Sequence, residues 1–448
     1  SEYLIEKGAG ETGINYRLRD WGISRQRFWG TPIPMINCEK CGTVPEKFEN
    51  LPVRLPENVS FTGATSPLKN MKEFYETDCP VCGGKAVRET DTMDTFVESS
   101  WYHMKYCDPH SEREPFSKEE VDHSMPVDKY IGGVEHAVMH LLYTRFFTKV
   151  LCDLGYVSFR EPVKDLLTQG MVCMETYSVD GEYLYPEEVS FENGRYFQTS
   201  TGKDVKIGRV EKMSKSKKNV VDPVKLIEKY GADTARLFVL FAAPPEKDLE
   251  WSEEGVEGCS RFLNRVWNIV TSNVELIKSA GTVVQPVSEG RDIWSKTHET
   301  IKKVNEDIER LHFNTAISAI MELVNSSYKF KPSSEQGKAV FGEALRTVIL
   351  LLEPFAPHIS EELAEICCMS SVSSQEMPEI CEEALQKEDI LIVVQVNGKV
   401  RDRLMLPADI SVEDIEKEVR YKDYSKFLKS GEIKKMVYVP GKLINVVG

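Results

Sequence analysis

The sequence has 448 residues, with 71 acidic against 56 basic side chains and a formal net charge of −15. This length predicts several domains, and the acidic total excludes indiscriminate nucleic-acid binding while allowing a local basic groove. The apolar runs fall short of the roughly 20 residues of a membrane span, and no signal peptide is recognisable, so we expect a cytoplasmic protein without a membrane partner. In that compartment we expect the cysteines to bind metal or to stay reduced.

The first feature along the chain is an arginine-rich segment without a helical or strand period, INYRLRDWGISRQRFWGTPIPM (14–35). Its arginines near Trp21 are Arg17, Arg19, Arg25 and Arg27. They are compatible with an ordinary protein surface. Their density beside aromatic rings also suits single-stranded RNA, because guanidinium groups bind phosphate and aromatic faces stack on bases.

Residues 31–90 are rich in proline, glycine and cysteine and are expected to form a small insertion. Two Cys-x2-Cys pairs lie in it, formed by Cys38, Cys41, Cys79 and Cys82. Two such pairs, each followed by glycine, predict a zinc ribbon with structural Zn²⁺, and four reduced buried thiols are the alternative. The remaining cysteines lack this spacing and are expected in the core.

Residues 91–250 alternate short apolar runs with helical patterns, which predicts a parallel α/β sheet. We expect a helix from about Glu135 to Leu154 and a strand at LLTQGMV (166–172). Turn signals at 180–181, 193–194 and 201–202 predict a hairpin-rich insertion over 175–208.

The stretch YIGGVEHAVMHLLYTRF (130–146) carries a candidate nucleotide contact. Gly132 and Gly133 allow a ligand close to the backbone at a strand end, and the carboxylate of Glu135 can accept both hydroxyls of a ribose. His136 and His140 have a helical spacing that zinc accepts; alternatively, both line a core.

The run VEKMSKSKKNVVDP (210–223) concentrates lysines in an acidic chain. A solvated charged surface is one interpretation. The other is a mobile loop at the edge of the sheet, where the ammonium groups of Lys212 and Lys215 follow a triphosphate as charge moves onto its leaving oxygens.

After Trp251 the pattern becomes helical and predicts a bundle over 251–387. Residues 388–448 predict a compact β-β-α-β-β module with a type I′ hairpin at Asn397-Gly398. Its basic residues, including Lys399 and Arg401, suit phosphate contacts or only make the sheet soluble.

KMSKS (212–216) is the signature loop of the class I aminoacyl-tRNA synthetases, which this sequence therefore resembles. The blocks NYRLRDWGISRQR, YIGGVEHA, QGMV, YGADTARLF and VQVNGKVR resemble the bacterial leucyl type, and such matches run along the whole chain. The implied fold is the second half of a Rossmann-like catalytic domain with a zinc-ribbon insertion, a helical bundle and a small α+β C-terminal domain.

The resemblance also implies roles for single residues. It assigns adenosine or ATP contacts to Gly133, Glu135, His140, Gln169, Met213, Ser214 and Ser216, with Lys212 and Lys215 catalytic. It places Ser99, Tyr102 and His136 in the leucine pocket. The arginine-rich segment is then expected to meet the acceptor end of tRNA.

One departure from the family is a missing His-Ile-Gly-His motif, and the threonine-rich editing domain is missing too. Residues 1–15 resemble the stretch just after that domain, so we expect a carboxyl-terminal half that needs an amino-terminal partner half. The predicted division is 1–30 leading into the core, 31–90 zinc ribbon, 91–250 catalytic half with its insertion (175–208), 251–387 tRNA-binding bundle and 388–448 C-terminal tRNA-binding domain.

The expected function is part of a leucine–tRNA ligase, which activates leucine with ATP and Mg²⁺ and transfers it to tRNA(Leu), this half being inactive alone. A non-catalytic tRNA-binding or assembly subunit, a zinc-ribbon nucleic-acid protein, and an isoleucyl or valyl synthetase are the alternatives. A ribose clamp and a complete lysine loop favour the active-site half, since a binding module has no use for them.

Overall fold

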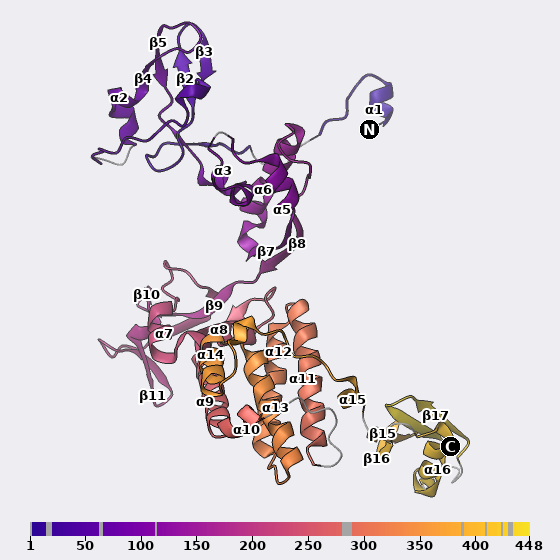
Figure 1. Ribbon diagram of the computed structural model, residues 1–448. Coiled ribbons are helices and arrows are strands. Elements are labelled where there is room, and N and C mark those ends of the chain that lie inside the picture. Colours follow the sequence, from indigo (N-terminus) through magenta and orange to yellow (C-terminus); the bar gives the residue numbers. More distant parts are fainter. Residues whose placement is uncertain are drawn as a thin grey trace. The chain divides into compact units, whose positions relative to one another are not determined.

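The computed structural model describes residues 2–14, 20–61, 66–112, 114–279, 289–386, 389–407, 410–422, 424–428 and 433–448 (Figure 1). The chain divides into two compact units, Ser1–Gln169 and Gly170–Gly448, and each is described by itself. Within the described residues, none of the helices combines the length and the apolar character needed to cross a membrane.

The first unit contains a small antiparallel sheet in the order β3-β2-β5-β4. Its elements are α1 (Glu2–Glu6), β1 (Ser24–Arg25), β2 (Met35–Cys38), β3 (Gly42–Pro45), η1 (Phe48–Asn50), η2 (Pro67–Asn70), α2 (Lys72–Tyr75), β4 (Glu76–Asp78), β5 (Lys85–Arg88) and β6 (Thr92–Met93). Strands β1 and β6 pair antiparallel where the chain leaves the small sheet. The core of this sheet is little more than Ile36, Val44 and two cysteines, Cys38 and Cys79. Such a small core needs a further cross-link.

The rest of the first unit is a β-α-β arrangement. It consists of α3 (Thr95–Ser99), α4 (Tyr102–Cys107), α5 (Lys118–Ser124), β7 (Val127–Gly133), η3 (Val134–Val138), α6 (His140–Asp153) and β8 (Val163–Gln169). Strands β7 and β8 are parallel, as predicted. The predicted helix start at Glu135 was wrong: residues 134–138 form a 3-10 helix, and α6 begins at His140.

The second unit opens with a sheet centred on β9. Its elements are β9 (Val172–Val179), β10 (Glu182–Leu184), η4 (Pro186–Glu188), β11 (Val189–Glu192), β12 (Arg195–Gln198), β13 (Lys206–Lys212), α7 (Pro223–Tyr230), α8 (Ala232–Ala242) and β14 (Leu249–Glu250). Strand β9 pairs antiparallel with β10 and β13 and parallel with β14, so this sheet is mixed. The predicted hairpin turns are found at 180–181 and 193–194, where Asp180 and Asn193 have positive φ.

Helices dominate the middle of the second unit, as the sequence predicts. They are α9 (Glu253–Thr271), α10 (Val274–Ser279), α11 (Arg291–Glu309), α12 (Phe313–Lys329), α13 (Glu335–Leu352), α14 (Pro357–Ile366), η5 (Val372–Ser374) and α15 (Glu382–Leu385). Figure 1 shows α11, α12 and α13 side by side. Trp294 and Ile320 are fully buried in the core cluster of the bundle. Burial of these apolar faces supplies the stability of the bundle.

The C-terminal module has the predicted β-β-α-β-β order. Its elements are β15 (Asp389–Val396), β16 (Lys399–Pro407), α16 (Val412–Tyr421), η6 (Ser425–Phe427), β17 (Lys435–Val439) and β18 (Leu443–Val447). The sheet order is β16-β15-β18-β17, with β15 and β18 parallel. Asn397 and Gly398 both have positive φ, as a type I′ turn requires, and Ser411 caps α16 through the Asp414 N–H.

Candidate functional site

The adenosine residues predicted from the sequence meet at the carboxyl ends of β7 and β8. Gly133 and Gln169 are register partners as the last residues of these parallel strands. The carboxylate of Glu135 folds back over Gly133, where an added Cβ would lie 2.3 Å from Glu135 Oε2. A side chain at position 133 would displace this carboxylate. Open α/β folds bind ligands beyond this edge of the sheet.

A chain of hydrogen bonds links Ser99 and Tyr102, two of the residues predicted for the leucine pocket, with His140, which was predicted to contact ATP. The hydroxyls of Tyr102 and Tyr130 are 2.7 Å apart, and the Tyr130 hydroxyl is 2.8 Å from His140 Nε2. His140 Nδ1 in turn lies 3.3 Å from Ser99 Oγ. Sequence reasoning missed Tyr130, although strand alternation places it on the same face as Gly132. The chain therefore joins α3, α4, β7 and α6 around one polar centre.

The surroundings of two groups in this chain, His140 and Tyr130, shift their pKa values so as to favour the uncharged forms. Burial and the neighbouring His136 lower the pKa of His140. Burial and the bond to Tyr102 raise the pKa of Tyr130. A neutral imidazole offers one donor and one acceptor nitrogen, so His140 can bridge Ser99 and Tyr130 at neutral pH.

Two further histidines present buried ring nitrogens beside this chain. Both nitrogens of His103 and Nδ1 of His136 have no hydrogen-bond partner among the described residues. Burial, and to a lesser extent His140, lowers the pKa of His103 to about 4, so this ring is neutral near pH 7. Buried polar atoms without partners are uncommon, which makes these rings candidates for contacts with a polar ligand.

The predicted lysine loop follows β13 in the second unit. Lys212 ends β13, and Lys215 lies exposed in the turn 215–218. The Met213 N–H donates to Val172 O at 2.9 Å, which ties the loop to β9. The hydroxyls of Ser214 and Ser216 are 3.3 Å apart. Lys217 is engaged internally, because its ammonium pairs with Glu211.

A buried amide that sequence reasoning missed closes the loop. Asn219 is fully buried, and its side chain bonds to backbone groups of Lys212 and Ser214 before the turn and of Met174 on β9. A local signal existed, since an asparagine ends the polar run directly before Val220 and Val221.

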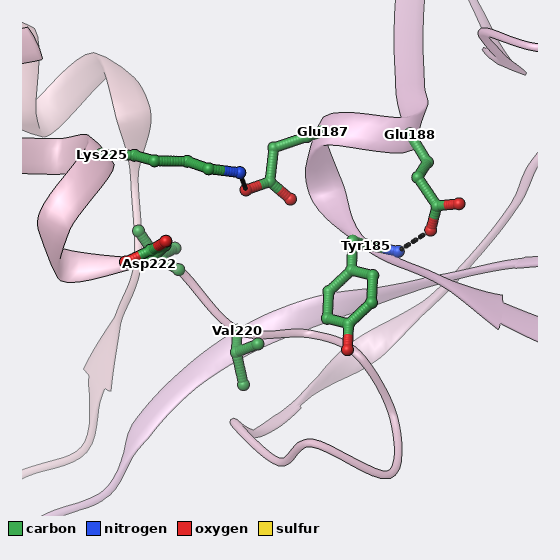
Figure 2. A pocket seen from close by; sticks show the side chains of 7 residues that line it. Tyr185, Glu187, Glu188, Val220, Asp222 and Lys225 are labelled. Atoms are coloured by element: carbon green, nitrogen blue, oxygen red, sulfur yellow. Dashed lines mark hydrogen bonds and ion pairs between the residues drawn. The ribbon is translucent and has the colours of Figure 1, made fainter.

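A cavity of about 380 Å³ lies between the 175–208 insertion and the segment after the lysine loop (Figure 2). Its lining residues are Tyr185, Glu187, Glu188, Val220, Val221, Asp222 and Lys225. Figure 2 shows Lys225 reaching from α7 to Glu187, with Nζ 3.1 Å from Oε1. The Lys218 ammonium lies 5.3 Å from the centre of the Tyr185 ring. The insertion therefore contacts the loop, although none of the predicted ATP residues lines this cavity.

The four predicted zinc ligands meet at one point. The Sγ atoms of Cys38, Cys41, Cys79 and Cys82 all lie within 4.8 Å of one another, and no other such group occurs among the described residues. Cys38 and Cys82 are 3.7 Å apart, close to the sulfur separation of a tetrahedral Zn–thiolate site with bonds of about 2.3 Å. The positive φ of Gly42 and Gly83 allows the two tight turns that aim the thiols inward. The arrangement fits Zn²⁺ and has no place for a reacting ligand.

The predicted RNA-contacting residues differ in how far their charged groups already interact with other residues of the protein. Arg25 pairs with Asp94 and donates to the carbonyls of Gly22 and Ser24, so its guanidinium is largely occupied. Arg27 and Lys399 are exposed, and Arg401 lies over the ring of Phe427 at 4.4 Å. Arg17 and Arg19 lie outside the described residues.

The predicted site is thus assembled in two separate parts. The first unit gathers Ser99, Tyr102, Gly133, Glu135, His136, His140 and Gln169. The second unit carries the lysine loop from Lys212 to Ser216.

Comparison with known proteins gives a consistent result along the chain. Residues 14–176 and 205–252 match the family model "tRNA synthetases class I (I, L, M and V)", and residues 290–417 match "Anticodon-binding domain of tRNA ligase". The leucine–tRNA ligases of Desulfatibacillum aliphaticivorans and Syntrophus aciditrophicus are 50% and 51% identical to the whole chain, which covers 53% of each relative.

A solved structure agrees with these sequence matches. It is the ternary complex of Agrobacterium radiobacter K84 agnB2 LeuRS-tRNA-LeuAMS, whose matched chain is 37% identical in sequence to this chain with a TM-score of 0.79. The match covers 100% of this chain and 53% of that chain. The chain therefore spans about half the length of the relatives that it matches.

Proposed function

The chain belongs to the class I tRNA synthetases of the bacterial leucyl type, and on that premise we propose that it supplies the lysine-loop half of the active site of a leucine–tRNA ligase together with its tRNA-binding domains. The observation that carries the proposal is the pairing of Gly133 with Gln169 under the carboxylate of Glu135. This arrangement places an acceptor for ribose hydroxyls directly against the backbone at the end of a parallel strand, which a structural sheet edge does not need.

In the proposed reaction, the carboxylate of leucine attacks the α-phosphorus of ATP, and the bond to pyrophosphate breaks. The terminal ribose hydroxyl of tRNA(Leu) then attacks the leucyl carbonyl and releases AMP. Gly133, Glu135 and Gln169 hold the adenosine. Lys212 and Lys215 neutralise the charge that develops on the departing pyrophosphate, with Met213, Ser214 and Ser216 contacting ATP. Mg²⁺ accompanies ATP and shares this neutralisation when bound.

The leucine pocket is proposed to lie around Ser99, Tyr102 and His136, with His140 between it and ATP. The neutral states of His140 and Tyr130 support this assignment, because they provide fixed dipoles without a buried charge. The alternative of a zinc site at His136 and His140 is less suited, since the described residues add no third ligand there.

Zn²⁺ is proposed as a structural ion held by the four cysteines. It would supply the cross-link that the small core of this sheet lacks, and it would take no part in catalysis.

The tRNA is proposed to contact the bundle over 251–387 and the C-terminal module over 388–448. Lys399 and Arg401 lie on the hairpin strand β16, where exposed cations can meet phosphates. Arg17, Arg19 and Arg27 are proposed to meet the acceptor end; Arg25 is the least suited of this group because Asp94 already neutralises it.

The remaining parts of the proposal concern the whole protein. The residues 1–30, 31–90, 91–250, 251–387 and 388–448 are proposed as its functional divisions. The stretch of the relatives that this chain does not cover is proposed to supply the His-Ile-Gly-His motif and the editing domain. The proposed location is the cytoplasm, where ATP and tRNA are present and thiols stay reduced.

The test is leucine-dependent pyrophosphate exchange, measured on this chain alone and after addition of the missing stretch, which together we call the assembled enzyme. We expect exchange only on mixing, above a Lys215→Ala control. Silence in both samples with intact tRNA binding would favour a non-catalytic tRNA-binding subunit. Exchange driven by valine or isoleucine rather than leucine would point to the related synthetases instead.

A further inference from the structure

Asn219 is the one fully buried polar side chain next to the lysine loop, although Lys215 and Ser216 beside it are exposed. Its amide is saturated with backbone partners. Oδ1 accepts from the Ser214 N–H at 3.0 Å, and Nδ2 faces the carbonyls of Met174, Glu211 and Lys212 at 3.1, 3.2 and 3.3 Å. A buried amide with this many partners has a definite structural task.

The partners fix which way the amide points. A flipped amide would set its oxygen against three carbonyl oxygens and its NH₂ against the Ser214 N–H, so only the observed orientation is compatible. The same argument distinguishes asparagine from aspartate here. A carboxylate has the same size, but it has no donor for the three carbonyls.

The positions of these backbone partners show which part of the loop the Asn219 amide holds. The Lys212 carbonyl and the Ser214 N–H lie on either side of Met213, and Met174 lies on β9. Other bonds of the turn are short-range, from the Lys217 N–H to Ser214 O at 3.2 Å and from the Lys218 N–H to Lys215 O at 3.3 Å, and the Lys217 ammonium pairs with Glu211. Together with the bond from the Met213 N–H to Val172 O, the amide thus fixes this turn to the strands beneath it.

We propose that Asn219 is a positioning residue, which holds the backbone from Lys212 to Ser214 on β9 and thereby sets where the Lys212 and Lys215 ammonium groups reach. The inference rests on the proposed function of the loop. Charge stabilisation of a transition state depends on groups fixed in advance, and a misplacement of about 1 Å can cost on the order of 100-fold in rate.

The test uses Asn219→Asp and the milder Asn219→Ala in the assembled enzyme. We expect kcat for leucine-dependent pyrophosphate exchange to fall on the order of 10- to 100-fold, with KM for leucine nearly unchanged. The matched control is Asn273→Ala, which removes a part-buried amide bonded to Ile269 O at 2.7 Å in the same unit, and it should leave exchange unchanged.

A double-mutant cycle separates positioning from general stabilisation. If Asn219 acts through Lys215, then Asn219→Asp should cost much less in a Lys215→Ala background than in the wild type. An equal cost in both backgrounds, or an unchanged kcat in both Asn219 variants, would overturn the proposal.

Limited trypsin digestion tests the same contact in a measurement that does not depend on pyrophosphate exchange. Cleavage after the loop lysines should be faster in the Asn219 variants than in Asn273→Ala, and equal rates would contradict the proposal. If the wild-type assembled enzyme shows no leucine-dependent exchange, the proposed function fails, while the digestion still decides whether Asn219 holds the loop.

Discussion

At the residue scale, Lys215 is the side chain on which the proposed chemistry depends most directly. It lies exposed in the turn, in contrast to Lys217, which pairs with Glu211. We expect Lys215→Ala in the assembled enzyme to lower kcat for pyrophosphate exchange on the order of 100-fold, the usual cost of removing one transition-state donor. Lys229→Ala, at an exposed lysine of α7, is the matched control. A Lys215→Ala enzyme with wild-type kcat would assign Lys215 to solvent alone.

The sequence could name several site residues because each has a local chemical signature. Gly133 and Glu135 were predicted from their spacing and from the family resemblance, and the register of β7 and β8 then brings Gln169 to them. Tyr130 and Asn219 were missed because their roles come from partners distant in sequence. Tyr130 meets Tyr102 across 28 positions, and Asn219 meets Met174 across 45. The local signals at these two positions do not encode such distant contacts.

At the element scale, the small sheet of β2, β3, β4 and β5 depends on its proposed metal. Because its buried core is so small, we expect Cys38→Ser or a strong chelator to remove zinc and unfold this sheet locally, a loss on the order of 10 kcal/mol for the module. Metal analysis and proteolysis between residues 31 and 90 would measure it. Cys368→Ser, at an exposed thiol outside the cluster, should retain the metal. A stable, metal-free wild type would instead support four reduced thiols.

The Glu289 carboxylate, bonded to the residues just before α13, should make the free energy of unfolding depend on pH. Glu289 accepts hydrogen bonds from the N–H groups of Ser333 and Ser334, each at 2.7 Å, and from both hydroxyls. These bonds, led by the one from the Ser334 hydroxyl, lower the pKa of Glu289 from 4.5 to about 2. A lowered folded-state pKa means that the stabilisation is present above pH 4.5 and is lost as the pH falls toward 2.

Glu289→Gln should therefore lower the urea midpoint at pH 7, and the difference from wild type should shrink below about pH 4.5. Glu335→Gln is the matched control, because Glu335 pairs only with Lys338 at an exposed surface. A difference independent of pH would show that the carboxylate charge is not the source of the effect.

The sequence predicted turns and helices correctly where one local signal determines the backbone conformation. The turns at Asp180, Asn193 and Asn397 were confirmed, since their positive φ follows from residue type. The start of α6 was wrong, because the apolar period continues through residues 134–138 while the backbone there is a 3-10 helix. Periodicity reports which side chains face the core and does not distinguish these two helices over one turn.

At the scale of the whole molecule, the net charge of −15 means that the proposed tRNA binding must rely on local basic patches. If Lys399 and Arg401 contact phosphates, replacing either with alanine should weaken tRNA(Leu) binding by this chain and reduce the salt slope of log Kd by about one. Fluorescence anisotropy over a salt series would measure this. Lys417→Ala, on α16 and paired with Asp414, is the matched control. Unchanged slopes would assign both residues to solubility.

The proposed division of the chain follows changes of composition and period near residues 31, 91, 251 and 388. Such changes do not predict the mixed strand pairing around β9. A strand with antiparallel neighbours β10 and β13 and a parallel neighbour β14 has the same apolar alternation as a strand in an all-parallel sheet.

Strand β9 has a consequence for how this unit opens. Its first residues receive the Met213 N–H of the loop at Val172 O, the Asn219 amide at Met174 O, and the Trp251 N–H that leads into the bundle at Cys173 O. Its far end carries the hairpin insertion through β10. Local unfolding at β9 would release all of these at once, so the loop, the insertion and the start of α9 form one cooperative unit whose free energy of opening limits how often the loop is lost.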